Sequence, residues 1–323
     1  MNKKHYKKRR YKKYLISLAI VILVVFSGRT IGSWYLEQQY SSTISKNHNS
    51  QDKSPTAAMD LENLYSPYAI LVDLDSGKII SGRSENEKIF PASLTKIMTA
   101  ILAIENTENL DTTITMPAYF FNQLYEANSS MAGFEPGETV RLRDLIYGIL
   151  LPSGAECCIA YADRISGSEK SFVKLMNQKA KSLGMKNTHF CNSTGLHDNE
   201  HYSTVKDISI LLQYALKNKD FKTAFCCQRY STMPSDRHPD GITFYSTMFK
   251  YMNTPDVTGG EILGGKTGYT EEAGLCLASM AKINGKEYML VTAKANGDHQ
   301  TEQFHILDAI NVYNQLGEKM VRE

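Results

Sequence analysis

The sequence predicts an α/β protein of the α+β type, in which an antiparallel sheet is flanked by helices and joined by a helical subdomain. Strand-like segments lie near both ends of the globular part, amphipathic helical segments fill the middle, and no internal repeat is present. Strands that are far apart in the chain must then meet in one sheet, on which the intervening helices pack.

The first predicted elements are a strand pair and three helices. Residues 66–82 (SPYAILVDLDSGKIISG) alternate around the turn Asp75-Ser76-Gly77, which indicates two short strands. Residues 90–105 (FPASLTKIMTAILAIE) carry apolar side chains at i, i+3, i+4, i+7 and i+8, the spacing of one buried helix. The same spacing predicts helices over residues 139–151 and 156–164.

The later elements change from helices to strands. Residues 172–183 and 205–216 predict two more amphipathic helices. Residues 274–283 and 287–295 then alternate on either side of Asn284-Gly285, a pair typical of a tight hairpin turn. A closing helix is indicated by apolar residues at Phe304, Leu307, Ile310 and Tyr313.

The N-terminal 63 residues differ in composition from the rest. Eight lysines and arginines between Lys3 and Lys13 are followed at once by an apolar run, the layout of an export signal or anchor. We expect a cytoplasmic basic tail over residues 1–14, an uncleaved transmembrane signal anchor over 15–36 and a flexible stem over 37–63, with a cleaved signal as the alternative. The positive-inside rule then places residues 64–323 outside the cytoplasm of a single-pass cell-membrane protein.

Charge and cysteine content narrow the functional classes. The net charge of +2 depends on the basic block, and the remainder of the chain is acidic, so no nucleic-acid partner is expected. The spacing of the six cysteines fits no zinc motif, and adjacent cysteines are poorly placed to bridge each other. We interpret them as buried small apolar residues, with one long-range disulfide as the alternative, and we expect no cofactor.

Ser93 and Lys96 form the first candidate catalytic pair. They stand one turn apart on the buried helix, so their side chains share a face. An ammonium group among apolar residues loses hydration, which lowers its pKa, and a neutral amine can take the proton of a nearby hydroxyl. The N–H groups of the helix start suit a developing oxyanion. However, Ser-x-x-Lys occurs five times in this chain and is weak evidence alone.

A second motif favours Ser93 over the other serines. Lys266-Thr267-Gly268 occurs once, in EILGGKTGYT, just before the final hairpin, so we expect it at a strand. A lysine and a threonine suit a carboxylate, and glycine lets a substrate backbone approach closely. A polar surface turn is the alternative interpretation.

The two motifs, about 170 residues apart, resemble those of penicillin-binding proteins and serine β-lactamases. LLPSGA at residues 150–155 occupies the place of their middle motif. With LGMKNTHFCNSTGLHDNEHYST at 183–204, the chain from Ser66 onward resembles the serine D-alanyl-D-alanine carboxypeptidases, which are low-molecular-mass penicillin-binding proteins. The resemblance implies a β-lactamase/transpeptidase-like fold over residues 64–323, without the second C-terminal domain common in relatives.

The resemblance also implies a role for each motif residue. Ser93 would be the acylated nucleophile, Lys96 its general base, and Ser153 the group that passes a proton to the leaving D-alanine. The substrate would be a peptidoglycan pentapeptide ending in D-Ala-D-Ala, and β-lactams would act as covalent inhibitors. The residues implied to bind the substrate, including its carboxylate and its oxyanion, are Lys266, Thr267, Gly268 and Tyr269.

Two positions depart from the family pattern. Ala155 stands where the middle motif has an asparagine that binds the motif lysine, a hydrogen bond whose loss costs about 1.5–3 kcal/mol unless a water or Glu156 replaces it. Gln303 stands where relatives often have an arginine before a phenylalanine. Recognition of the substrate carboxylate is therefore expected to depend more on Lys266.

Alternative functions follow from these departures. A β-lactamase is one, although no Glu-x-x-Leu-Asn motif is present to activate water. A non-catalytic penicillin-sensing or wall-binding protein, disabled by Ala155, is another. The membrane-bound layout resembles, more loosely, accessory enzymes of glycopeptide resistance, so a contribution to vancomycin resistance is weighed against housekeeping wall trimming. His197, Asp198 and His201 are metal ligands by type, but their spacing is not that of the helical zinc motif, and no metal is expected.

Overall fold

The computed structural model describes residues 59–322, all within one compact unit that begins at Ala58. The predicted basic tail, the signal anchor and the stem as far as residue 58 lie outside the described residues. Between residues 59 and 322, none of the helices combines the length and the apolar character needed to cross a bilayer.

Two of the residues that were expected to end the flexible stem, over 59–63, have buried side chains, whereas Asp60, Glu62 and Asn63 are exposed. Met59 and Leu61 are each 3% exposed and join an apolar cluster with the C-terminal helix. Ser81 donates a hydrogen bond to the Met59 carbonyl oxygen (2.7 Å), and Arg83 donates one to that of Leu64 (3.1 Å). The sequence did not predict this packing, because two apolar residues among polar neighbours give no periodic signal.

A six-stranded antiparallel sheet, in the order β2-β1-β10-β9-β8-β7, forms the base of the fold. The first part of the chain contributes β1 (Tyr68–Asp73) and β2 (Ile79–Arg83), and β1 pairs with β10 so that Ile70 lies opposite Val291. The predicted union of distant strands is therefore confirmed. The other strands are β7 (Asp256–Val257), β8 (Gly260–Thr270), β9 (Gly274–Ile283) and β10 (Lys286–Ala295).

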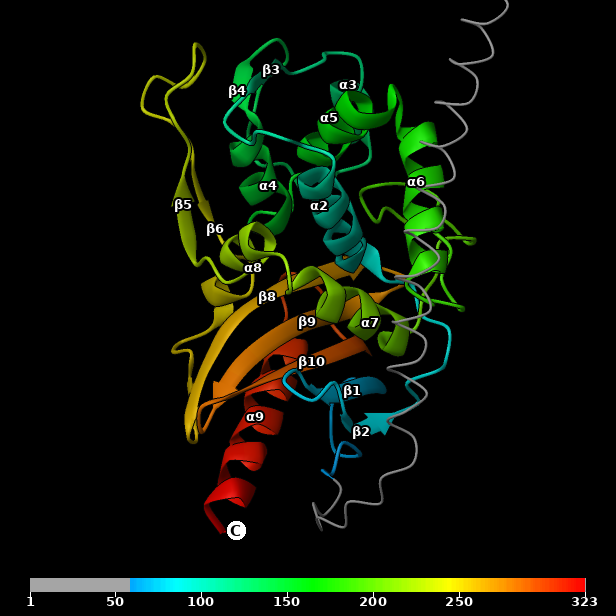
Figure 1. Ribbon diagram of the computed structural model, residues 1–323, viewed down its shortest axis with the longest axis vertical. Helices are drawn as coiled ribbons and strands as arrows, with labels where there is room; N and C mark the ends of the chain where they lie inside the picture. The colour runs from blue at the N-terminus through cyan, green and yellow to red at the C-terminus, as the bar shows by residue number, and fades with distance from the viewer. Residues whose placement is uncertain (1–58, 323) are drawn as a thin grey trace, which may run out of the picture. The chain divides into compact units, whose positions relative to one another are not determined.

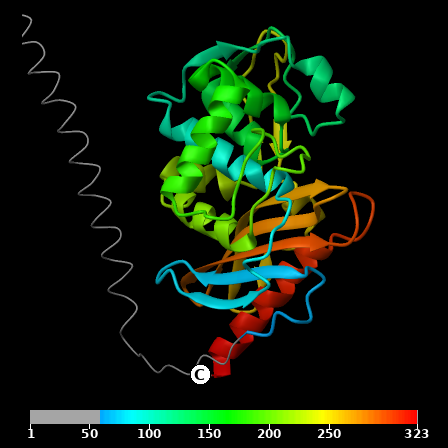
Figure 2. The ribbon, with the colours of Figure 1, turned by 90° about the vertical axis from the view of Figure 1, so that its right-hand side faces the viewer.

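Helices cover both faces of this sheet. α9 packs on one face, and α7 with the helical subdomain lies on the other (Figures 1 and 2). Two small two-stranded sheets extend the subdomain: β3 (Thr113–Thr115) pairs with β4 (Thr139–Arg141), and β5 (Arg229–Ser231) forms a hairpin with β6 (Thr243–Tyr245). The helices and 3-10 turns are η1 (Ala92–Thr95), α2 (Lys96–Glu105), α3 (Phe121–Glu126), α4 (Leu142–Leu150), α5 (Ala155–Ser166), α6 (Glu169–Ser182), α7 (Val205–Ala215), α8 (Lys219–Phe225), η2 (Phe249–Tyr251) and α9 (Phe304–Arg322).

Strands β1, β9 and β10 are largely apolar because both of their faces are buried. In β9, Cys276, Ala278 and Met280 join the core beneath the helical subdomain. The alternate side chains, including Leu277 and Ile283, join the core beneath α9. This period of two places the sheet between two hydrophobic layers and fixes its register.

Two predicted helices are shorter than expected. The helix over residues 90–105 is divided, because Ala92 has a positive φ of 46° and only a 3-10 turn, η1, precedes α2. The helix over residues 139–151 begins at Leu142, because residues 139–141 pair with β3 as a strand. Three residues are too few to separate a strand period from a helical one.

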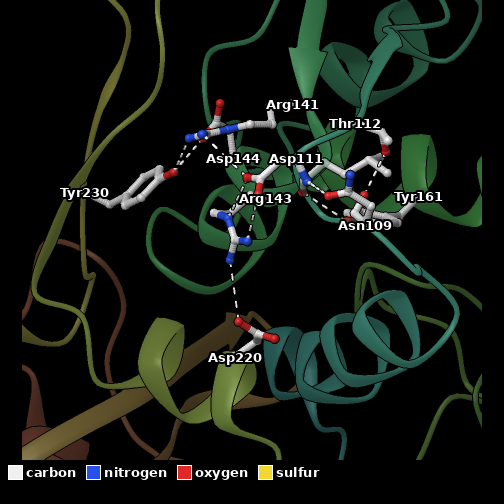
Figure 3. Close-up of polar contacts among 10 residues, drawn as sticks. Asn109, Asp111, Thr112, Arg141, Arg143, Asp144, Tyr161, Asp220 and Tyr230 are labelled. Carbon is white, nitrogen blue, oxygen red and sulfur yellow. Dashed lines mark hydrogen bonds and ion pairs between the residues drawn. The ribbon is translucent and has the colours of Figure 1, made fainter.

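An ionic network joins the subdomain to its neighbours (Figure 3). Arg141 donates to Asp144 (2.8 Å) and to the Tyr230 hydroxyl (2.9 Å), which ties the start of α4 to the β5–β6 hairpin. Arg143 pairs with Asp111 at 3.0 Å and reaches Asp220 of α8 at 3.5 Å. The contacts of Arg141 hold the β5–β6 hairpin in place. The segment 246–251, which contributes to the lining of the candidate site, follows directly after β6.

Candidate active site

Ser93 and Lys96 meet at the junction of η1 and α2. The Lys96 Nζ lies 2.9 Å from the Ser93 Oγ. Ser93 is half-buried in η1, and Lys96, the first residue of α2, is 3% exposed. The serine therefore reaches the surface of the core while the lysine remains inside it. This is the arrangement that a proton acceptor beside a nucleophile requires.

Burial controls the protonation of Lys96. Loss of hydration lowers the pKa of its ammonium group, and the nearby Cys158 and Glu156 oppose this effect only in part. No carboxylate forms an ion pair with Lys96 among residues 59–322. The neutral amine is thus favoured relative to an exposed lysine, and its lone pair can accept the Ser93 proton.

The Thr194 carbonyl oxygen is the second partner of Lys96, at 2.6 Å. It is held by a turn in which the Asn192 Oδ1 accepts from the backbone N–H groups of Thr194 (3.2 Å) and Gly195 (2.7 Å). Gly195 has a φ of +84°, and a Cβ there would stand 2.0 Å from the Ala92 carbonyl oxygen. Sequence reasoning missed Thr194, although the Asn-Ser-Thr-Gly turn signal of residues 192–195 marks the segment.

Strand β8 brings the Lys-Thr-Gly motif against Ser93. A Cβ at Gly268 would lie 3.0 Å from the Ser93 backbone nitrogen, so only glycine allows this approach. Tyr269 follows in the same strand, opposite Leu275 of β9. The motif is therefore part of a strand, and the alternative of a surface turn is excluded.

A cavity of about 100 Å³ lies between these elements. It adjoins a larger one of about 340 Å³, which also reaches Lys96, Ala155 and Thr194. The structure thus brings most of the predicted site residues to one continuous cleft. Those that line the smaller cavity are Ser93, Ser153, Thr267, Gly268 and Tyr269. Gln303, which stands at the position of the arginine of relatives, also lines it, together with the unpredicted Ser130, Thr247, Lys250, Tyr251, Leu275, His299 and His305.

Ser153 adopts an unusual backbone conformation at the cleft. Its φ of 70° lies in the left-handed region, which costs a non-glycine residue about 1–2 kcal/mol. It is 5% exposed, and its hydroxyl has no hydrogen-bond partner among the described residues. A strained residue with a buried, unpaired hydroxyl in a cavity is suited to contact a bound molecule.

The position of the missing asparagine is occupied only by the methyl group of Ala155, which lines the larger cavity. Glu156 does not replace the amide, because its Oε1 accepts from the backbone N–H groups of Ala132 (2.6 Å) and Gly133 (2.9 Å) and it makes no hydrogen bond to Lys96. Burial raises the pKa of this carboxyl group. Glu156 instead anchors the segment that carries Ser130 into the cleft.

Lys266 and Gln303 both bond to their own surroundings. The Lys266 Nζ donates to the Thr267 carbonyl oxygen at 2.8 Å, and the side chain is buried outside the lining of either cavity. Burial, and then the proximity of Lys96, lowers the pKa of Lys266 well below its usual value. The amide nitrogen of Gln303 donates to the carbonyl oxygens of Asp298 (3.0 Å) and Thr301 (2.7 Å).

The histidines near the cleft have structural contacts. His201 accepts from the Cys191 N–H at Nδ1 (3.2 Å), so its Nε2–H donates to the Thr95 hydroxyl (2.8 Å) beneath the nucleophile. Burial lowers its pKa to about 4, which keeps it neutral. Within residues 59–322, no group of three or more His, Cys, Asp or Glu is arranged to hold a metal ion, and all six cysteines are unpaired.

Comparison with known proteins identifies the family. Residues 52–297 match the model of the D-alanyl-D-alanine carboxypeptidases, peptidase S11. The chain is 35% identical over 215 residues to the D-alanyl-D-alanine carboxypeptidase DacF of Bacillus subtilis, covering 66% of this chain and 53% of that one. It is 30% identical over 220 residues to the D-alanyl-D-alanine carboxypeptidase of Streptomyces sp. K15, covering 65% and 74% of the two chains.

The fold agrees with this assignment. The crystal structure of the Streptomyces K15 DD-transpeptidase matches with a TM-score of 0.69 and 26% identity, over 78% of this chain and 96% of that one. The chain spans only about half the length of the Bacillus subtilis relative, 53%. The matched residues nevertheless include the serine, the lysine and the Lys-Thr-Gly strand that form the cleft. The chain therefore belongs to the D-alanyl-D-alanine carboxypeptidase family, peptidase S11.

Proposed function

We propose that the protein is a serine D,D-carboxypeptidase that removes the terminal D-alanine from peptidoglycan stem peptides through an acyl-enzyme. One observation supports this most directly. The Ser93 hydroxyl lies 2.9 Å from a buried lysine, in a cleft whose opposite wall is the Lys-Thr-Gly strand. Family membership supplies the substrate class, a peptide ending in D-Ala-D-Ala.

The geometry suits two-step acyl transfer. Lys96 takes the proton of Ser93 as the Oγ attacks the carbonyl carbon of the penultimate D-alanine. The N–H groups of Ser93 and Tyr269 stabilise the oxyanion. The C–N bond then breaks, and Ser153 passes a proton to the amine of the departing D-alanine. Water hydrolyses the ester in the second step and releases the shortened peptide. β-Lactams would acylate Ser93 by the same route.

The test is to incubate the purified full-length chain with diacetyl-L-Lys-D-Ala-D-Ala and to assay free D-alanine, with Ser93→Ala as the control. We expect release that is lost in the variant. Intact-mass measurement after treatment with penicillin should show one adduct. Digestion of the labelled chain should locate this adduct on a peptide containing Ser93.

Two other results would assign a different function. Fast penicillin hydrolysis without D-alanine release would indicate a β-lactamase. A stable penicillin adduct with no turnover of either substrate would indicate a non-catalytic penicillin sensor or wall-binding protein, as expected if Ala155 disables the site.

We also propose that residues 15–36 anchor the protein in the cell membrane, with the catalytic unit outside the cytoplasm. The basic block before an apolar run supports this placement. Protease added to intact cells should degrade the catalytic unit and spare the N-terminal tail; protection of the whole chain would refute the orientation.

A finer hypothesis is that trimming of D-Ala-D-Ala precursors contributes to vancomycin resistance. It rests on the proposed chemistry and on the membrane-bound layout. Deletion of the gene should raise the level of pentapeptide precursors and lower the inhibitory concentration of vancomycin. A change in precursors without a change in susceptibility would leave wall trimming as the role.

A further inference from the structure

Lys266, on which recognition of the substrate carboxylate was expected to depend, does not line the cleft, and Gln303 stands where relatives often have an arginine. The Lys266 ammonium group is turned away and bonds to the Thr267 carbonyl oxygen. The Gln303 nitrogen already donates to two loop carbonyl oxygens, so its amide hydrogens are not free for a ligand. A substrate with a terminal carboxylate must therefore find its positive partner elsewhere.

Lys250 is the lysine that lines the smaller cavity. It lies in η2 and is exposed, and its Nζ stands 5.5 Å from the centre of the Tyr251 ring. None of the carboxylates in the described part of the chain pairs with it, and no Asp or Glu is among the residues that line this cavity. An unpaired ammonium group in a cavity free of carboxylates favours an anionic ligand.

Two hydroxyl groups lie in the same cavity. Thr247, three residues before Lys250, and Thr267 of β8 place their Oγ1 atoms 2.6 Å apart. One hydroxyl donates to the other, so a proton remains to be donated to a ligand. A lysine beside such a pair offers a charge and a directed hydrogen bond to one carboxylate.

The histidines of the cavity are weaker candidates. Burial lowers the pKa of His305 to about 3, so it carries no charge at neutral pH. The His299 ring stands edge-on to Tyr269, with 4.8 Å between ring centres. His299 therefore serves as the comparison in the experiment below.

We propose that Lys250, with the paired hydroxyls of Thr247 and Thr267, recognises the terminal carboxylate of the substrate in this chain. This rests on the proposed carboxypeptidase function and assigns a residue that specifies the substrate. Lys250 discriminates a free C-terminal acid from a capped one, while Ser93 and Lys96 perform the chemistry on both.

The experiment compares diacetyl-L-Lys-D-Ala-D-Ala with the same peptide ending in a carboxamide. In the wild-type chain we expect a higher kcat/KM for the acid. Lys250→Met should lower kcat/KM for the acid about 10- to 100-fold, the effect of losing a hydrogen bond to a charged group. The amide should be cleaved as before, and Lys250→Arg should retain most of the preference for the acid.

Lys181→Met, at an exposed position of α6, is the matched control and should leave kcat/KM unchanged for both peptides. The proposal is overturned if Lys250→Met slows both peptides equally or neither. It is also overturned if His299→Asn, rather than Lys250→Met, abolishes the preference. If the wild-type chain cleaves neither peptide, the proposed carboxypeptidase function itself fails. Cleavage of the peptides without the expected effect of Lys250→Met overturns only the role of Lys250, so the two failures are distinguishable.

Discussion

The reactivity of this site depends on how a single lysine is solvated. Lys96 lies in a core where loss of hydration lowers the pKa of its ammonium group, and its two hydrogen-bond partners are a hydroxyl and a carbonyl oxygen. A carbonyl partner orients the amine without adding a full negative charge that would hold the proton. The same residue would be an inert surface cation if it were exposed.

Acylation should therefore become faster as the pH rises. Below the lowered pKa the lysine is protonated and cannot accept the Ser93 proton; above it, the neutral amine can. The second-order rate constant for labelling by a fluorescent penicillin should increase between pH 5 and 10 and level off at a pH below 10.5, the usual pKa of a lysine. A rate that is flat or falls over this range would exclude Lys96 as the base, and Lys96→Ala should abolish labelling.

Substitution of Ala155 by asparagine should increase the rate of acylation. The cavity of about 340 Å³ beside it also reaches Lys96, so an asparagine amide has room there. Ala155→Asn should accelerate acylation by penicillin about tenfold, because a hydrogen bond to the lysine is worth roughly 1.5 kcal/mol or more. The comparison is with the wild-type chain at equal thermal stability. A slower rate would show that the site is adapted to alanine.

At the scale of elements, the contact between η1 and β8 positions the chemistry. The strand carries Gly268 past the Ser93 backbone nitrogen with no space for a side chain. The turn at Gly195 approaches the Ala92 carbonyl oxygen in the same way from another side. Two glycines thus let two distant segments close on the nucleophile.

Gly268→Ala should impair catalysis more than folding. The new Cβ would stand 3.0 Å from the Ser93 nitrogen, and β8 must move by a few tenths of an ångström, which misaligns the oxyanion site. We expect acylation to fall about 100-fold, with a change in unfolding free energy of about 1–3 kcal/mol. Gly82→Ala in β2 is the control, because its nearest neighbours are atoms of the flexible Glu85 side chain. Equal rates in the two variants would contradict this account.

At the scale of the whole molecule, the fold buries two neutral histidines. His201 supports Thr95, and His305 lies at the start of α9; burial lowers their pKa values to about 4 and about 3. As the pH is lowered, these histidines bind protons near pH 6.5 in the unfolded chain, but only at a lower pH in the folded chain. Folding stability must therefore fall as the pH decreases from about 6.5 towards these lower values.

Acid should destabilise the protein through His201 by on the order of 3 kcal/mol once the pH is below its folded pKa. The urea concentration at the midpoint of unfolding should fall from pH 7 to 5.5 and to 4.5. In His201→Gln the dependence of stability on pH should be weaker, because about one proton fewer is taken up on unfolding. The variant will be less stable at pH 7, since it alters the bond to Thr95. An unchanged pH dependence in the variant would show that other groups cause the acid sensitivity.

Much of this architecture follows from local sequence pattern. The hairpin around Asn284-Gly285 and the six longer helices are encoded by turn residues and apolar spacing, which operate over a few neighbours. The short elements β3 to β7, α3, α8 and η2 were not predicted, because segments of two to seven residues carry no measurable period. Packing of Met59 and Leu61 was missed for the same reason.

By itself the sequence determined the fold class, the family motifs and the pairing of Ser93 with Lys96, because these depend on spacing along one segment. Only the tertiary structure showed which further groups from other segments complete the cleft: the Thr194 carbonyl oxygen, Thr247 and Lys250. It also turned Lys266 towards the Thr267 carbonyl oxygen of β8, and Gln303 towards the loop carbonyl oxygens of Asp298 and Thr301. The physical reason is that a side chain's partners and hydration are set by the segments that fold against it, and residue type and spacing do not specify those contacts.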